Sequence, residues 1–199
     1  MNAQPLTFRP KQQPIDLASI ISSRADQLAR TIVRMCIDGP ERDLRRTLLS
    51  VNSATARRAT EEAAVLYAFV ADRSANAFLD RDLVPEDFRT AFQLRLLDEI
   101  PSLLSKEWGD RPEDVAVSRA RFLELWSARQ AEYGSCGRMY RQENESLDGT
   151  VIFAFYQNLL EMGHETALHV LANIQVPLLH IEISKSFGEL ICQALGMEV

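Results

Sequence analysis

The chain has 199 residues, of which 46% are hydrophobic and 25% charged, and its net charge is −6. A chain of this length is long enough to bury the core of one globular domain. It contains no apolar run near the ~20 residues of a transmembrane helix, and its first residues lack the apolar region of a secretory signal. We therefore expect a cytoplasmic protein that does not enter a membrane.

The charge is spread unevenly along the chain. Residues 1–60 carry ten basic side chains against five acidic ones, a balance of +5, whereas the remainder carries 12 against 23, a balance of −11. Such asymmetry can mark a face for an acidic protein partner, but it can equally dock the basic third on the acidic remainder. We favour an internal or solvated role for these charges and keep an acidic partner or self-association as the alternatives.

Residues 1–14 contain three Pro and three Gln and predict an extended arm. Residues 15–199 predict a single all-α domain. Apolar residues at steps of three and four predict a first helix that Gly39-Pro40 ends, and a short helix at 41–50. A longer helix is expected from Ser53 or Thr55 to about Leu79. It is expected to carry Ala63, Leu66, Phe69, Val70 and Phe78 on one face.

Two later helix starts share the sequence Pro-Glu-Asp, at residues 85–87 and 112–114. Proline suits the first helical position, and acidic side chains there complement the helix dipole. We expect Pro101 to break the first of these helices and the second to reach about Tyr133. The polar segment 134–149 predicts a functional loop. One long helix over 150–175, and a last one after Val176-Pro177 to about Leu195, complete a bundle-like fold of about six to eight helices.

The segment EMGHETALH, at residues 161–169, holds two of the three histidines of the chain. Glu161 and His164 match half of the ExxH pattern of di-iron carboxylate bundles, but the chain contains no second ExxH. His164 and His169 are five residues apart, whereas a zincin needs histidines four apart. We favour a histidine at the rim of a helix, with iron or another metal held by Glu161 and His164 as the alternative.

His180 is predicted to lie on the apolar face of the last helix, together with Leu178, Ile183 and Phe187. The favoured interpretation is a core histidine whose ring nitrogen has a hydrogen-bond partner. The alternative is an axial ligand to haem, because such ligands project into apolar pockets between helices.

Basic side chains gather in the segment 42–58, which includes Arg45, Arg46, Arg57 and Arg58. A helix-turn-helix here would place the last two early on a recognition helix, but the acidic domain repels phosphate, so nucleic acid is not the expected partner. In the loop, Arg138 and Arg141 could hold an anion or lower the pKa of Cys136 if that thiol were a nucleophile.

Phe155 lies outside the expected apolar stripe of its helix and is predicted to contact a second subunit or to line a pocket.

The chain contains no complete set of catalytic residues in a recognisable motif. We therefore predict a regulatory, ligand-binding or protein-interaction module, and not an enzyme. It is expected to need no cofactor and to be capable of forming a homodimer. A haem- or metal-binding sensor or enzyme is the first alternative, and a DNA-binding regulator is the second.

Overall fold

The computed structural model of this chain describes residues 17–37, 52–79, 86–143 and 145–194. These residues form helices and connections with one isolated β-bridge, between Arg138 and Thr150, and contain no named strand. The predicted all-α fold is confirmed. The predicted arm at 1–14 and the predicted short helix at 41–50 lie outside the described residues.

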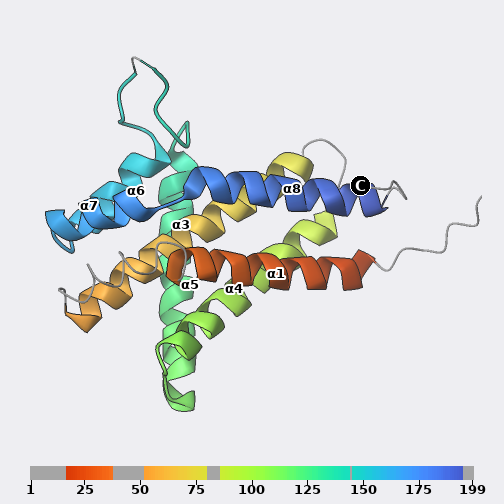
Figure 1. The fold of residues 1–199 in the computed structure, drawn as a ribbon, viewed down its shortest axis with the longest axis horizontal. Helices are drawn as coiled ribbons and strands as arrows, with labels where there is room; N and C mark the ends of the chain where they lie inside the picture. The colour runs from red at the N-terminus through yellow and green to blue at the C-terminus, as the bar shows by residue number, and fades with distance from the viewer. Residues whose placement is uncertain (1–16, 38–51, 80–85, 144, 195–199) are drawn as a thin grey trace, which may run out of the picture.

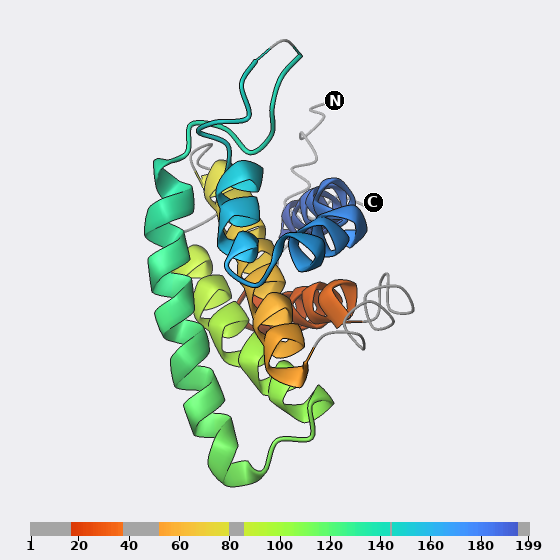
Figure 2. The same ribbon diagram turned by 90° about the vertical axis from the view of Figure 1, so that its left-hand side faces the viewer.

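The described helices are arranged around α3, which contacts all the others (Figures 1 and 2). α1 and α8 lie side by side on one side of α3, and α5 crosses on the other side (Figure 2). None of the described helices is long and apolar enough to cross a membrane. Their bounds are α1 Leu17–Ile37, α3 Ser53–Leu79, α4 Glu86–Glu107, α5 Pro112–Ser135, α6 Val151–Leu160, α7 His164–Asn173 and α8 Val176–Ala194.

The central position of α3 means that this helix buries more than the predicted apolar face, whose members Ala63, Leu66, Phe69 and Val70 are all buried. Every residue from Ala59 to Asp72 is buried, so this middle part of the helix is enclosed on all sides. Six alanines lie on about one half of its circumference and let neighbouring helices approach closely there, since each adds only a methyl group. A helix covered on every side does not need a single apolar stripe, so the spacing of its large residues indicated only part of its buried surface. The alanines are Ala59, Ala63, Ala64, Ala68, Ala71 and Ala75.

Pro101 lies inside α4 and does not end it, which corrects a second prediction. Proline costs a helix one hydrogen bond and some steric strain. Ile100 and Leu104, on either side of it, are fully buried. The helix packs against α1, α3 and α5. We attribute the continuation to this packing, because helical stability in proteins comes mostly from tertiary contacts.

The predicted long helix over 150–175 is two helices, α6 and α7, separated by a sharp turn. Thr150 begins α6, and its hydroxyl accepts a hydrogen bond from the Phe153 amide at 3.2 Å. Gly163 then adopts a φ of +106°, a conformation that favours glycine. Its amide donates to the Leu160 carbonyl at 3.0 Å, which tightens the last turn before the chain changes direction. A helical wheel drawn through this turn therefore misplaces the residues that come after it.

Two neighbouring carboxylates on α3, Glu61 and Glu62, are buried and pair with arginines of α5. Glu61 pairs with Arg121, and burial raises the pKa of its carboxyl although that arginine opposes the change. Glu62 accepts from Arg129 through two hydrogen bonds of 2.9 and 2.6 Å. These pairs join the central helix to α5. Sequence reasoning missed them, although two glutamates directly before the apolar run 63–71 were a visible signal.

A third carboxylate of α3, Asp72, is buried on the side of α4. Its oxygens accept from Gln93 at 3.1 Å and from Asn76 at 3.3 Å. Burial raises the pKa of the Asp72 carboxyl above its usual 3.8, and the nearby positive charge of Arg89 partly offsets this. The folded protein therefore holds a proton here at pH values where the unfolded chain has already lost it.

This raised pKa predicts how the stability of an Asp72→Asn variant compares with that of the original protein. Between the unfolded and folded pKa values the native state binds more protons, so the contribution of Asp72 to stability falls as pH rises. Asparagine does not titrate, so its contribution to stability does not change with pH. The free energy of unfolding of Asp72→Asn, measured with urea from pH 3 to 7, should therefore improve relative to the original protein as pH rises. A difference that moves the other way would contradict the buried position of this carboxyl.

Candidate interaction surface

The segment 161–169 does not bring its histidines and glutamates together. Glu161, one of the two predicted metal ligands, forms an ion pair with Arg58. His164, the other, is exposed at the start of α7, and its Nδ1 lies 3.1 Å from the Tyr156 hydroxyl. The Nε2 of His169 lies 3.7 Å from the Oε1 of Glu165. Among the residues that the structure describes, no three His, Cys, Asp or Glu side chains are placed to hold a metal ion.

His180 lies on the exposed side of α8, so the predicted apolar surroundings were wrong. The helix packs on α3 and α1 through Val176, Leu179 and Ile183, a face rotated away from the predicted one. The Nδ1 of His180 lies 3.2 Å from the Oγ of Ser74, which is buried on α3. Ser74 lies within α3, so this contact joins α8 to the central helix.

The Arg57 side chain is held in a cluster of contacts within the protein, at the connection between α4 and α5. Its guanidinium donates to both oxygens of Asp110, at 2.8 and 2.6 Å, and to the Ser118 hydroxyl at 2.8 Å. It also lies over the Trp108 ring, 4.3 Å from the ring centre. This hydrogen-bonded arginine holds the pKa of the Asp110 carboxyl below its usual value. Arg57 therefore joins the start of α3 to the helix pair α4–α5.

The other predicted partner-binding arginines divide into three groups. Arg58 pairs with Glu161, and Arg138 pairs with Glu145 in the loop. Arg141 is exposed and has no acidic partner among the described residues. Arg45 and Arg46 lie outside the described residues. For Arg57 and Arg58, the basic third of the chain does dock on the acidic remainder, as the favoured interpretation of the charge asymmetry expected.

The segment 136–150 connects α5 to α6 as a loop that projects beyond the helices (Figures 1 and 2). Its base is closed by the amide of Val151, which donates to the Arg138 carbonyl at 2.9 Å. Cys136 lies where the loop begins, and burial, together with the nearby Glu132, raises the pKa of its thiol. A reactive cysteine needs the opposite shift, so these surroundings argue against a nucleophile.

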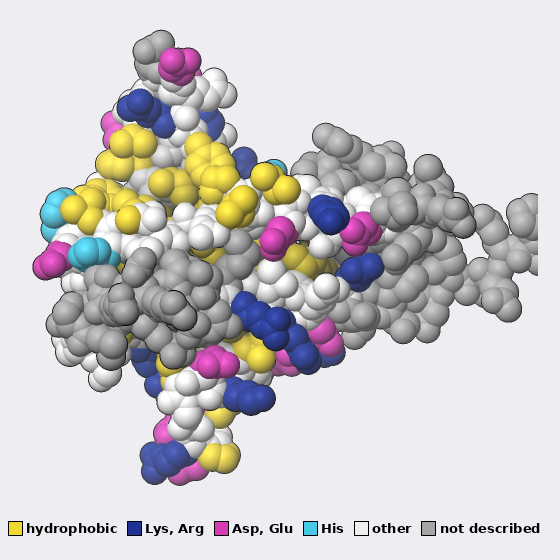
Figure 3. Space-filling view, viewed as in Figure 1, with side chains coloured by type: hydrophobic (Ala, Val, Ile, Leu, Met, Phe, Trp, Pro, Cys, Tyr) yellow, Lys and Arg dark blue, Asp and Glu magenta, His cyan; other side chains and the backbone are white. Residues whose placement is uncertain are grey.

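Exposed apolar side chains gather on one part of the molecule. Figure 3 shows them over α6, α7, the first half of α8 and the base of the loop. On α8, Leu178 and Ile181 are 52% and 61% exposed and lie one helical turn apart, so they form a ridge on the side of α8 that no other described helix covers. We define the apolar surface by its large exposed side chains, Tyr140, Leu147, Leu168, Leu178 and Ile181.

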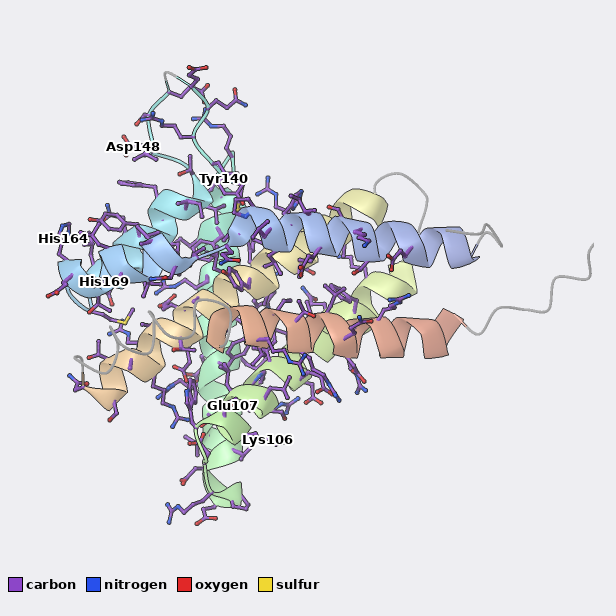
Figure 4. The ribbon with its side chains drawn as sticks, in the orientation of Figure 1. Lys106, Glu107, Tyr140, Asp148, His164 and His169 are labelled. Carbon is purple, nitrogen blue, oxygen red and sulfur yellow. The ribbon has the colours of Figure 1, made fainter. Side chains whose placement is uncertain are left out.

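Figure 4 places this surface relative to the labelled side chains. His164 lies at the start of α7 and His169 farther along the same helix, and Tyr140 lies where the loop leaves the helices. Lys106 and Glu107 lie at the end of α4, on the opposite side of the molecule.

The apolar surface was not predicted from the sequence, although the sequence contained a signal for it. The first half of α8 has apolar residues on both sides of the helix, more than one packed face requires.

Apolar side chains that gather on one part of a surface mark an interaction site more often than scattered ones do. No known protein family, curated protein or solved structure matches this chain. Among the described residues, the apolar surface is therefore the feature that points most directly to a function.

Proposed function

We propose that the protein is a cytoplasmic, helical protein-interaction module that binds its partner through the apolar surface of the loop, α7 and α8, and so acts as a regulatory component. The observation that carries this proposal is the ridge of Leu178 and Ile181. α8 already buries Val176, Leu179 and Ile183 against its neighbours. A second row of large apolar side chains on the outer face adds nothing to that packing, and its burial by a partner would be favourable.

The described arginines support the same choice of surface. Arg57, Arg58 and Arg138 are each paired with an acidic side chain of the same chain. An acidic partner or a DNA phosphate would have to replace these existing pairs. Apolar side chains form no ion pairs that a partner would have to break, so binding at the apolar surface costs less reorganisation.

A photo-crosslinking amino acid at position 181 tests the proposal in cells that make the protein. We expect one discrete crosslinked product from position 181, and we expect the additional substitution Leu178→Ser to remove it. A crosslinker at Val117 is the matched control, because this residue is also apolar and 68% exposed but lies on α5. Equal products from positions 181 and 117, or none from position 181, would contradict the proposal.

A further inference from the structure

The charges beside the apolar surface indicate which kind of partner it fits. On α7, Glu165 is 91% exposed and lies three residues before Leu168, on the same side of the helix. On α8, Glu182 is exposed and lies four residues after Leu178. Each of the two exposed leucines therefore has a carboxylate one helical turn away.

Few positive charges offset these carboxylates. Among the described residues of the loop, α7 and α8, Arg138 and Lys185 are paired with acidic side chains, and Arg141 alone has no such partner. Four acidic side chains in the same elements have no arginine or lysine partner among the described residues. They are Glu143, Asp148, Glu165 and Glu182.

This charge pattern disfavours a second copy of the chain. A symmetric dimer places the same surface of each copy against the other. Glu165 and Glu182 of the two copies would then approach one another, and like charges brought together at an interface are unfavourable. A partner that carries positive charge beside its apolar residues gains from the same carboxylates.

The shape of the surface favours a helix as that partner. Leu178 and Ile181 form a ridge at a spacing of three residues, and such ridges pack into the grooves of another helix. Resting on the proposed function, we propose that the apolar surface binds an amphipathic helix whose apolar stripe is flanked by lysine or arginine. The stripe contacts Leu168, Leu178 and Ile181, and the flanking cations meet Glu165 and Glu182.

A displayed library of helical peptides tests this proposal without knowledge of the natural partner. Every peptide carries the same leucine stripe, and its flanking positions are randomised among Lys, Gln and Glu. Selection on the full-length protein should enrich Lys over Glu at these positions by about threefold or more, and the enrichment should weaken as salt is raised. The double variant Glu165→Gln/Glu182→Gln should lose the enrichment. Glu107→Gln/Glu113→Gln, which changes exposed acids away from the surface, should keep it.

The other outcomes separate this inference from the proposed function. Peptides retained regardless of flanking charge, and lost with Leu178→Ser, would overturn the basic partner and leave the interaction module in place. A concentration-dependent dimer that Leu178→Ser abolishes would overturn it in favour of a second copy. Retention of no peptide, together with no crosslinked product from position 181, would overturn both proposals.

Discussion

Replacing Arg129 by methionine is expected to lower the free energy of unfolding by about 3–5 kcal/mol, the range for breaking a buried ion pair from one side. The side chain of Glu62 is 1% exposed and that of Arg129 is 15% exposed. Methionine keeps much of the volume of the arginine but removes both hydrogen bonds to Glu62. The carboxylate is then left buried between α3 and α5 without a positive partner, and this desolvated charge is the source of the loss.

Urea denaturation of Arg129→Met measures the effect, and Arg111→Met is the matched control. Arg111 also pairs with two acids, Glu113 and Asp114, but its side chain is 71% exposed. Exposed pairs contribute little, so the control should lose no more than about 0.5 kcal/mol. The double variant Glu62→Met/Arg129→Met should recover most of the loss, because both buried charges are gone. Equal losses in Arg129→Met and the control would show that the Glu62 pair does not stabilise the fold.

Phe155→Ala is expected to destabilise the protein by about 3–5 kcal/mol, as truncation of a buried phenylalanine usually does. The Phe155 side chain is 0% exposed, in a helix that packs against α3, α5 and α7. Its removal leaves a cavity that the surrounding helices cannot fill completely. The same burial shows that the predicted role of Phe155, in contact with a second subunit or in the wall of a pocket, was wrong.

The neighbouring Phe153→Ala is the control for this measurement. Phe153 lies in the same helix but is only partly buried, so its truncation should cost about 1 kcal/mol. Thermal or urea unfolding of both variants provides the comparison. A loss for Phe155→Ala no larger than that for Phe153→Ala would contradict the buried position of Phe155.

The phenylalanine pair shows why the helical wheel was insufficient in this region. The prediction assumed one continuous helix over 150–175 and placed Phe155 outside its apolar stripe, whereas Phe155 is buried. The chain instead turns at Gly163, and α6 is a short helix with contacts of its own. The direction of the apolar stripe in so short a helix depends on the neighbours that cover it.

For the candidate surface, the sequence contained the residues but not their exposure. Leu178 was predicted to be buried beside His180, and both side chains are exposed. Apolar residues lie on both sides of α8, so periodicity alone does not decide which side packs on α3. The partners of Arg57 and Arg58 were equally inaccessible, because Asp110 and Glu161 lie 53 and 103 residues away along the chain.

The sequence by itself determined the helical class and most helix starts. At residues 112–114, Pro-Glu-Asp begins α5 as predicted, because proline and nearby acids act within one turn. The tertiary structure alone decided that α4 continues through Pro101, that the middle part of α3 is enclosed on all sides, and that α8 turns Leu178 and Ile181 outward. The physical reason is the distance along the chain over which each interaction acts. Capping and helix-dipole effects act between neighbours in the chain, whereas burial and ion pairing depend on helices that meet only after folding.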